Sequence, residues 1–348
     1  MHKLREKIFR IFPLFILIAI IVVMFVSVAR HRDRSVIETR HYSVMGGIIL
    51  EVKLYGKPGN LKSAFEAIYQ KVAEVDEICN IYKPESELSR LNKSAYEKPF
   101  ACGELLWSVL CESKKYYELS GGAFDISAAP LMKLWGFYRK RKTLPSPEEV
   151  ADAKTHIGLN KVIFDPKNKT IHFTVPGMRL DLGGIAKGFA VDLAANIAKE
   201  HNVTIGLINL SGNAYCFPDP FPGKKRYTIG VRNPMHKSAI CGKVELLDQS
   251  VATSGDYERY VIINGRHYAH IMDPRTGDPV ENMLSVTVIT SSATAADALS
   301  TSVFINGAKF AEKIHAEQPD TSFLIIRKND KGKSEMFKIG NIWDACKL

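Results

Sequence analysis

Apolar side chains recur along the chain at intervals that distinguish helices from strands. After residue 60, six apolar positions repeat at spacings of three and four: Leu61, Phe65, Ile68, Val72, Val75 and Ile78. This period places them on one face of a helix, and Asn60 is expected to cap its N-terminus. A second helix is predicted over residues 104–119, where Gly121-Gly122 ends it. Helices are also predicted over residues 185–200 and 293–316.

Other segments carry the alternation and turn residues of β-strands. Strands are predicted over residues 42–55 with an interruption at Gly46-Gly47, and over 204–210, 226–231, 259–264, 284–290 and 322–327. A hairpin is predicted over 162–175, and Ser146, Pro147 and Glu149 predict a capping box at a helix start. Because the strands come in neighbouring pairs rather than in regular β-α-β alternation, we expect an α+β fold of largely antiparallel sheets flanked by helices, occupying residues 35–348.

Residues 11–29 form an uncharged, apolar run with Lys and Arg on both sides. In a helix these nineteen residues span about 28 Å, close to the thickness of the bilayer hydrocarbon core. The length favours an uncleaved membrane anchor, and a cleaved signal ending at Ser27-Val28-Ala29 is the alternative. Residues 1–34 are therefore predicted to be an anchor or signal segment. The long body behind it is expected on the periplasmic side of the inner membrane.

The composition excludes a disordered or disulfide-dense chain, since 46% of the residues are hydrophobic and 24% are charged. The net charge of +10 first suggests a nucleic-acid partner, but half of it lies in residues 1–34. The basic run 139–142 has no aromatic platform beside it, so no nucleic-acid role is expected. The six cysteines lack the spacing of a zinc site, and Cys102 with Cys111 is the first pair to test for a disulfide.

The segment 180–188 (LDLGGIAKG) leads from a short strand through paired glycines into an amphipathic helix. Such a start exposes backbone N–H groups and the positive end of the helix dipole to an anion, and Lys187 adds a full charge. The segment matches neither the Walker pattern nor G-x-G-x-x-G. A phosphate site is therefore one interpretation, and a helix start whose glycines only allow close packing is the other.

The segment 267–277 (HYAHIMDPRTG) places a polar cluster between two predicted strands. Pro274 and Gly277 define turns that hold His270, Asp273 and Arg275 in a short arc. A proton-transfer residue beside a guanidinium would suit phosphoryl chemistry. In the alternative interpretation, Asp273 only organises the Asp-Pro turn and His270 is a core histidine.

The segment 290–301 (TSSATAADALST) surrounds Asp297 with small residues and places Thr301 four positions later, on the same helix face. A carboxylate and a hydroxyl are hard oxygen ligands for Mg²⁺, which needs few protein ligands when phosphates and waters complete its shell. Helix capping is the alternative, and it suits Ser292 or Thr294 better than Asp297.

Residues 180–188, 270–277 and 294–301 of these segments, together with four further segments, resemble the ApbE family of FAD:protein FMN transferases. The four are residues 45–46 (MG), 82–92 (YKPESELSRLN), 122–126 (GAFDI) and 251–257 (VATSGDY). The resemblance runs from about residue 42 to residue 323, and the seven segments follow the family's order. The sequence departs from the family's pattern at two positions. At Gly184 family members often have Ala or Ser, and at Ala298, directly after the metal-binding Asp, they commonly have Gly.

The resemblance implies a Mg²⁺-dependent enzyme with an ApbE-like catalytic domain. Such an enzyme splits the pyrophosphate of FAD, attaches FMN to a Thr or Ser hydroxyl of an acceptor protein through a phosphoester, and releases AMP. Acceptors in the family include flavoprotein subunits of Rnf-type complexes and of Na⁺-translocating NADH:quinone reductase. A membrane attachment through residues 11–29 fits such partners.

The resemblance also implies the site residues. Flavin contacts are expected at Met45, Tyr82, Ala123, Phe124, Asp125, Asp181, Lys187, His270 and Ile271. Metal ligands are expected at Asp297, Thr301 and the backbone carbonyl of Gly184. His270 and Asp297 are the catalytic candidates, and because a carboxylate bound to a cation is a weak base, His270 is the better general base.

Two other functions fit the same residues. One is a Mg²⁺-dependent FAD pyrophosphatase, in which water replaces the acceptor hydroxyl and the products are FMN and AMP. The other is a non-catalytic flavin-binding protein at the membrane. The Asp297 and Thr301 pair disfavours simple binding, because a carrier needs no metal at the pyrophosphate.

Overall fold

The computed structural model describes residues 20–21, 24, 34–236, 238–343 and 346–347. Most of the apolar run 11–29 lies outside these residues, so its assignment as an anchor or signal stays a prediction. In the part of the chain that the structure describes, no helix is both long enough and apolar enough to cross a membrane.

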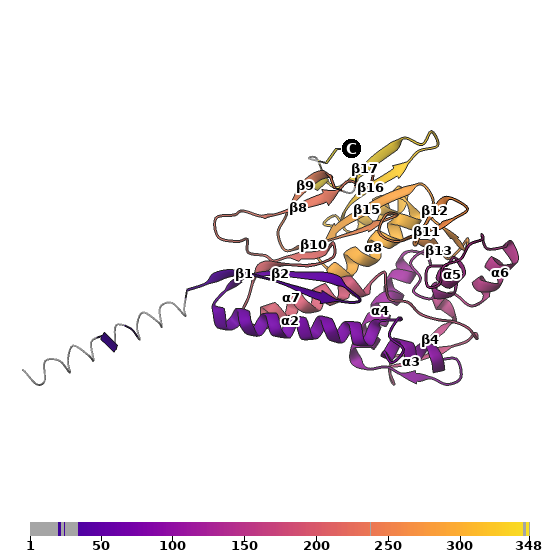
Figure 1. Ribbon diagram of the computed structural model, residues 1–348, viewed down its shortest axis with the longest axis horizontal. Helices are drawn as coiled ribbons and strands as arrows, with labels where there is room; N and C mark the ends of the chain where they lie inside the picture. The colour runs from indigo at the N-terminus through magenta and orange to yellow at the C-terminus, as the bar shows by residue number, and fades with distance from the viewer. Residues whose placement is uncertain (1–19, 22–23, 25–33, 237, 344–345, 348) are drawn as a thin grey trace, which may run out of the picture.

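An eight-stranded sheet forms the centre of the structure (Figure 1). Its strands lie in the order β1, β2, β6, β7, β10, β15, β16, β17, and every neighbouring pair is antiparallel. The bounds are β1 Val36–Val44, β2 Ile48–Gly56, β6 Ile205–Leu210, β7 Asn213–Cys216, β10 Gln249–Gly255, β15 Met283–Thr290, β16 Ser322–Lys328 and β17 Ser334–Ile339. The predicted α+β fold with antiparallel sheets is confirmed.

Short strands form four smaller sheets. They are β3 Phe100–Ala101 with β5 Thr170–Phe173 and β4 Val162–Asp165, β8 Tyr227–Arg232 with β9 Ile240–Leu246, β11 Tyr260–Ile263 with β12 Arg266–Ala269, and β13 Met272–Asp273 with β14 Asp278–Pro279. The β4–β5 pair is the hairpin predicted over 162–175. The interruption predicted at Gly46-Gly47 is the turn between β1 and β2, and β1 begins six residues earlier than the sequence pattern predicted.

Eight α-helices of the described residues accompany the sheets. They are α2 Pro58–Cys79, α3 Glu87–Ser94, α4 Glu104–Leu119, α5 Ala129–Leu134, α6 Pro147–Thr155, α7 Ala186–Glu200, α8 Ala293–Asn306 and α9 Ala308–Glu317, with the 3₁₀ turns η1 Leu159–Lys161 and η2 Asn341–Trp343. The prediction for α4 is confirmed at both ends, and the capping box of Ser146 and Glu149 at α6 is present.

Two helix predictions are wrong in detail. Asn60 does not cap α2, because the helix begins at Pro58, whose ring presets the backbone angle and which has no N–H to satisfy. The helix predicted over 293–316 is divided in two at Gly307, which adopts φ 78° and so leaves the right-handed helical region.

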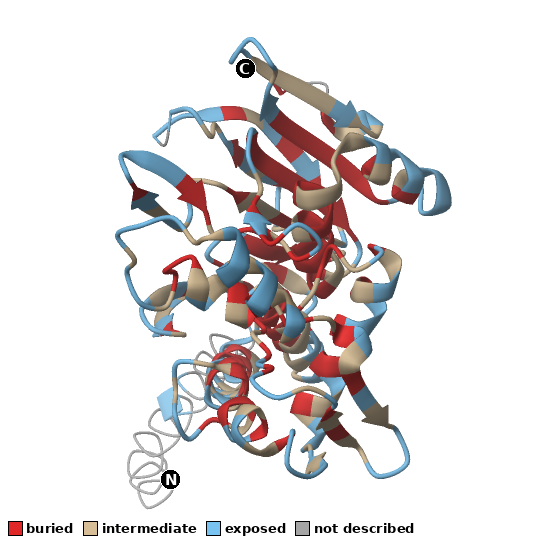
Figure 2. Ribbon diagram, turned by 90° about the vertical axis from the view of Figure 1, so that its right-hand side faces the viewer, coloured by how far each residue is buried: buried red, intermediate tan, exposed pale blue. Residues whose placement is uncertain are grey.

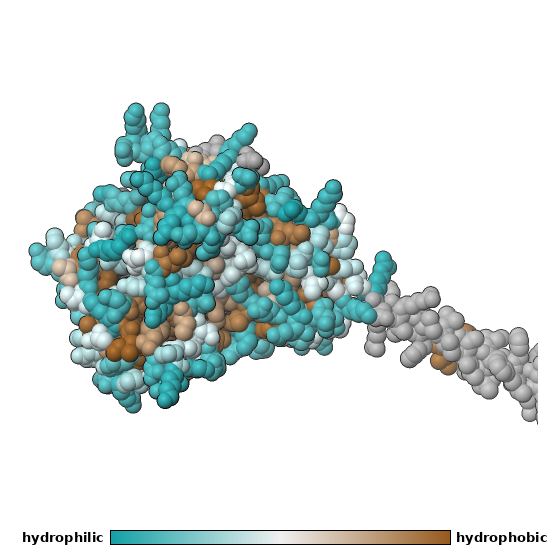
Figure 3. All heavy atoms as spheres, turned by 180° about the vertical axis from the view of Figure 1, so that it is seen from behind, coloured by the Kyte–Doolittle hydropathy of each residue, from teal (hydrophilic) through white to brown (hydrophobic). Residues whose placement is uncertain are grey.

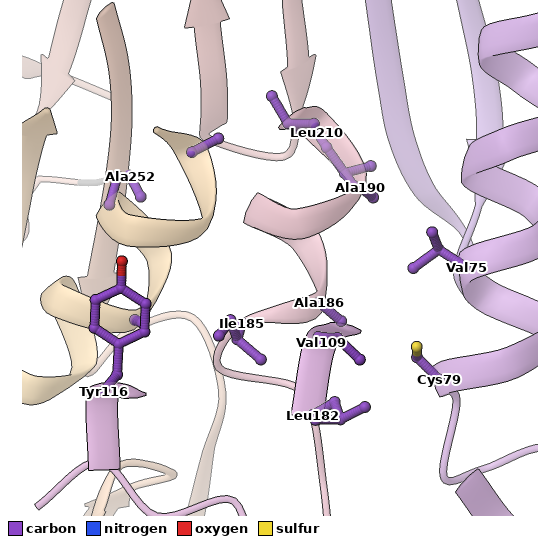
Figure 4. Close-up of a cluster of buried hydrophobic side chains, with 14 of the residues drawn as sticks. Val75, Cys79, Val109, Tyr116, Leu182, Ile185, Ala186, Ala190, Leu210 and Ala252 are labelled. Atoms are coloured by element: carbon purple, nitrogen blue, oxygen red, sulfur yellow. The ribbon is translucent and has the colours of Figure 1, made fainter. Parts of the chain in front are cut away.

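The main core lies between the sheet and the helices α2, α7 and α8, which contact one face of the sheet (Figure 1). In Figure 4, Val75 and Cys79 of α2 point toward α7, where Ala186 and Ala190 lie. Figure 2 shows that the central strands of the sheet are mostly buried. A second cluster that includes Trp343 joins the β8–β9 hairpin to the opposite face.

Hydrophilic side chains cover much of the face shown in Figure 3, as expected when most apolar side chains are buried in the core.

All six cysteines are free thiols, so the Cys102–Cys111 disulfide is absent.

Candidate active site

The helices α7 and α8 meet at a very short distance, and this contact builds one wall of the site. A Cβ added to Gly188 would lie 2.2 Å from the carbonyl oxygen of Ala293 and 2.8 Å from Cβ of Asp297. Only glycine fits there without moving one helix, because real Cβ atoms do not approach backbone so closely. Gly188 also donates its N–H to Oδ2 of Asp297 over 3.0 Å.

Asp192 on α7 holds the first turn of α8. Its carboxylate accepts hydrogen bonds from the hydroxyls of Ser292 and Thr294, at 2.7 and 2.6 Å, and from the N–H groups of Ala293 and Thr294, at 2.8 and 2.9 Å. Ser292 also caps α8 by accepting from the N–H of Ala295, as the alternative interpretation of this segment predicted. Asp192 therefore fixes the register in which α8 presents Asp297.

We expect Asp192→Ala to lower the free energy of unfolding by about 2–4 kcal/mol, since the variant leaves several buried donors without their charged acceptor. Chemical denaturation of the purified protein measures this loss. The matched control is Asp152→Ala on α6, whose side chain is 79% exposed and whose removal should change stability by less than about 0.5 kcal/mol. Equal stability of the two variants would contradict the role given to Asp192.

A cavity of about 500 Å³ opens where α7 and α8 meet the β1–β2 turn, the end of α2, the segment before α5 and the end of β10. All twelve residues predicted from the sequence line it: Met45, Tyr82, Ala123, Phe124, Asp125, Asp181, Gly184, Lys187, His270, Ile271, Asp297 and Thr301. The structure thus brings together residues from six separate segments. Their individual roles stay predictions.

The oxygen groups predicted to hold a metal lie together on the α7–α8 wall. Asp297 is 5% exposed, and Thr301 lies one turn later on α8. A Cβ added to Gly184 would lie 3.6 Å from the hydroxyl oxygen of Thr301, so the backbone at Gly184 is close to that side chain. A carboxylate, a hydroxyl and a carbonyl form a donor set that fits Mg²⁺. In the described part of the chain, no group of three or more His, Cys, Asp or Glu side chains could hold a metal.

Lys187 supplies the positive charge beside this donor set. Its ammonium lies 3.5 Å from Oδ1 of Asp297 and 3.3 Å from the carbonyl oxygen of Gly183. Several backbone N–H groups of the glycine turn, which the sequence offered to an anion, are already paired. The N–H groups of Gly183, Ile185, Ala186 and Gly188 each have a partner within the protein. These bonds favour the interpretation in which the glycines allow close packing, and the role of Lys187 as an anion-binding group stays a prediction.

Asp125 and Asp181 are anchored by neighbouring polar groups. Asp125 accepts from the N–H and the hydroxyl of Ser127, at 2.8 and 2.6 Å. Burial raises the pKa of Asp125, and the bonds from Ser127 partly offset this effect. Asp181 accepts from the hydroxyl of Tyr138 and from the N–H of Gly183. Burial and the nearby carboxylate of Asp181 raise the pKa of Tyr138, so this phenol stays protonated.

His270 is held through its ring nitrogen Nδ1, which lies 3.0 Å from the carbonyl oxygen of Arg259. A carbonyl only accepts, so Nδ1 carries the proton and Nε2 keeps its lone pair in the neutral ring. Burial, helped by the positive charges of Lys187 and Arg259 and partly offset by the hydrogen bond to the Arg259 backbone, lowers the pKa of His270 from 6.5 to about 4. The ring is therefore neutral at physiological pH.

Arg259 is a residue of the cavity that sequence reasoning missed. Its guanidinium lies 5.7 Å from the ring centre of Tyr82 and 5.9 Å from that of Tyr138, and it donates to the carbonyl of Phe137. Tyr82 is 56% exposed and packs edge-on against Tyr138. No local pattern marks Arg259, because a lone Arg before a strand has no characteristic spacing.

Arg275 does not line the cavity, which favours the alternative interpretation, in which Asp273 organises the turn, over a phosphate-binding guanidinium. Two hydrogen bonds of 2.8 Å join Arg275 to the two carboxylate oxygens of Asp273, and a third reaches Asn306. Neither Asp273 nor Arg275 lines the cavity. Asp273 also accepts the N–H of Arg275, as expected for a residue that organises the turn.

Comparisons with known proteins agree with this fold. The model of the ApbE family matches residues 45–325. The FAD:protein FMN transferase of Haemophilus influenzae is 29% identical over 310 residues, which cover 85% of this chain and 89% of that protein. The FAD:protein FMN transferase of Klebsiella pneumoniae is 30% identical over 291 residues, which cover 82% and 88%.

Solved structures show the same similarity. The ApbE protein of Thermotoga maritima superposes with a TM-score of 0.77 at 32% identity, covering 86% of this chain and 96% of that one. The flavin transferase ApbE of Vibrio cholerae gives a TM-score of 0.78 at 26% identity, covering 90% and 100%. The fold is thus that of the flavin transferase class of proteins. The chain belongs to the ApbE family.

Proposed function

We propose that this protein is an FAD:protein FMN transferase that uses Mg²⁺, attaches FMN to a Thr or Ser hydroxyl of an acceptor protein, and releases AMP. The observation that carries the proposal is the convergence of Asp297, Thr301 and the Gly184 backbone with Lys187 and a neutral His270 in one cavity. Oxygen ligands, a cation and a proton acceptor are what phosphoryl transfer requires.

The proposed metal site uses Asp297, Thr301 and the Gly184 carbonyl. A bound Mg²⁺ supplies charge neutralisation at the pyrophosphate oxygens. Lys187, 3.5 Å from Asp297, is placed to bind a pyrophosphate oxygen on the same wall and to stabilise the charge of the leaving AMP. Asp297 is held in place by the N–H of Gly188, so it is oriented before substrate binds.

His270 is proposed to accept the proton of the acceptor hydroxyl at Nε2. The bond of Nδ1 to the Arg259 carbonyl fixes the ring and its tautomer. The acceptor oxygen then attacks the FMN phosphorus and the bond to AMP breaks. Tyr82 and Arg259 offer an aromatic and a cationic surface at the cavity for the rings of the dinucleotide.

The pH dependence of transfer tests the role of His270. Because the pKa of His270 is lowered to about 4, the ring of the free enzyme stays unprotonated well below pH 6.5. We expect kcat/KM to hold from pH 7 to pH 5.5 and to fall tenfold per pH unit only below about pH 4, since this ratio reports groups of the free enzyme.

The control for that profile is His270→Gln, which keeps a polar side chain but does not titrate. This variant should be slower by about 10²–10⁴-fold, the usual worth of a general base, and its profile should lack the acid limb. A wild-type limb centred near pH 6.5 that disappears in His270→Gln would contradict the lowered pKa.

One incubation separates the proposed transfer from its two alternatives. The protein is mixed with FAD, Mg²⁺ and a candidate acceptor, and flavin fluorescence is read on a denaturing gel. A fluorescent acceptor band means transfer, free FMN with AMP means hydrolysis, and unchanged FAD means binding alone. An acceptor whose target Thr is replaced by Val is the matched control and should stay dark.

The proposed function also implies a location in the cell. We infer that residues 11–29 attach the protein to the inner membrane, with residues 35–348 on the periplasmic side, near acceptor subunits of Rnf or Na⁺-translocating NADH:quinone reductase type. The basic residues around the apolar run support it, because Lys and Arg favour lipid headgroups. Fractionation of cells that produce the full chain, followed by protease treatment of intact spheroplasts, tests both statements.

A further inference from the structure

Asn213 lines the cavity, and its side-chain oxygen Oδ1 has no hydrogen-bond partner among the described residues. The residue is only 2% exposed. A buried carbonyl left unpaired costs about 1–3 kcal/mol, so an apolar side chain would serve the fold better at this position. The chain keeps an amide here, which points to a ligand that the amide binds.

The strand β7 directs Asn213 toward the helices. Asn213 follows a two-residue turn, in which Ser211 and Gly212 adopt φ 51° and 95°, and it pairs with Leu210. Side chains alternate between the faces of a strand. Tyr215, on the same face as Asn213, belongs to the main core between the sheet and the helices, whereas Ala214 belongs to the cluster on the opposite face.

The neighbouring strand β10 places Asn213 close to the proposed metal site. Val251 of β10 pairs with Ala214 of β7, so the next residue of β10, Ala252, lies beside Asn213. Ser254 follows Ala252 by two positions along β10 and therefore lies on the same face of the sheet. Such diagonal neighbours lie roughly 7–8 Å apart. The hydroxyl oxygen of Ser254 lies 3.4 Å from that of Thr301, one of the proposed Mg²⁺ ligands. Asn213 therefore faces whatever part of the substrate flanks the pyrophosphate.

We propose that the carboxamide of Asn213 binds a sugar hydroxyl of the dinucleotide, either on the ribose or on the ribityl chain. These groups are the ones next to the pyrophosphate on its two sides. A hydroxyl both donates and accepts, so it matches an amide whose Oδ1 accepts and whose Nδ2 donates. A phosphate oxygen does not match, because it would face the lone pairs of Oδ1. The inference rests on the proposed function, since it takes FAD as the substrate.

The test compares Asn213→Ala with Ser250→Ala. Ser250 lies on β10, is fully buried, and its hydroxyl oxygen also lacks a partner among the described residues, but it does not line the cavity. Both variants should keep or raise the melting temperature of the ligand-free protein, because each removes an unpaired buried polar group. Only Asn213→Ala should weaken FAD binding, by roughly tenfold, as expected for the loss of a hydrogen bond of about 1.4 kcal/mol.

Separate titrations with ADP and with FMN identify the sugar. Weaker ADP binding by Asn213→Ala assigns the ribose if a second result agrees with it. Wild type and variant must bind one of the two analogues that lack a ribose hydroxyl, 2′-deoxy-ADP or 3′-deoxy-ADP, with equal affinity. Weaker FMN binding assigns the ribityl chain. Asn213→Ser, which keeps a shorter hydroxyl, replaces the alanine variant if that variant does not fold.

Unchanged affinity of a folded Asn213 variant for FAD, ADP and FMN overturns the inference. So does a large fall in the melting temperature of both ligand-free variants, Asn213→Ala and Asn213→Ser, because that result would mark a structural role. These outcomes are separate from a failure of the proposed function, in which the wild-type protein itself neither binds nor uses FAD.

Discussion

Asp297→Ala is expected to abolish Mg²⁺-dependent flavin transfer. Asp297 is the single carboxylate in the proposed donor set, and a bound metal contributes several kcal/mol to transition-state stabilisation. At 1.4 kcal/mol per factor of ten, the rate should fall about 10³-fold or more. A second measurement is independent of turnover: Mg²⁺ should tighten FAD binding to the wild-type protein and should have no such effect on the variant.

The matched control is Asp320→Ala, an exposed carboxylate in the loop after α9 that does not line the cavity. It should transfer flavin at the wild-type rate. Near-normal Mg²⁺-dependent transfer by Asp297→Ala, with the variant folded, would remove the metal assignment. Thermal unfolding shows whether Asp297→Ala is folded. If it is not, Thr301→Val is tested instead, because this change removes the hydroxyl ligand of the proposed metal site with little change in the shape of the side chain.

Gly188→Ala is expected to lower the free energy of unfolding by about 3 kcal/mol, the upper range for overpacking a close contact. The added Cβ would meet the Ala293 carbonyl at 2.2 Å, and both are backbone-bound atoms that cannot rotate away. The helices α7 and α8 must therefore separate. Transfer should also fall, because the N–H of Gly188 and Cβ of Asp297 lie at this contact.

Gly59→Ala is the matched control for that prediction. Gly59 lies in the first turn of α2, where an added Cβ meets no atom within 4 Å. The same chemical change should there leave stability unchanged or raise it by up to about 1 kcal/mol, because alanine restricts the unfolded chain. Denaturant unfolding of both variants measures the difference. Equal effects at the two positions would show that the α7–α8 contact is not as close as described.

Local patterns predicted most of the elements correctly. The period of three and four in α2, the paired glycines after α4 and the capping box of α6 are all short-range signals, and each acts within one or two turns of chain. The errors are local as well. Asn60 is a good capping residue, but Pro58 starts the helix two residues earlier, and Gly307 breaks a helical stretch whose apolar residues continue past it.

The sequence alone determined the antiparallel α+β fold, the resemblance to the ApbE family and the twelve residues that line the cavity, because these follow from short motifs and their order. Only the tertiary structure decided how the cavity is held. Asp192 reaches Thr294 across 102 positions, Arg259 lies over Tyr82 and Tyr138, and Arg275 turns to Asp273 rather than to the cavity.

The same holds for the unpaired amide of Asn213, which becomes visible only when every neighbour is in place. The physical reason is that periodicity and spacing report which face of an element a side chain takes. They do not report which distant element packs against that face, and hydrogen-bond partners, burial and pKa are properties of that packing.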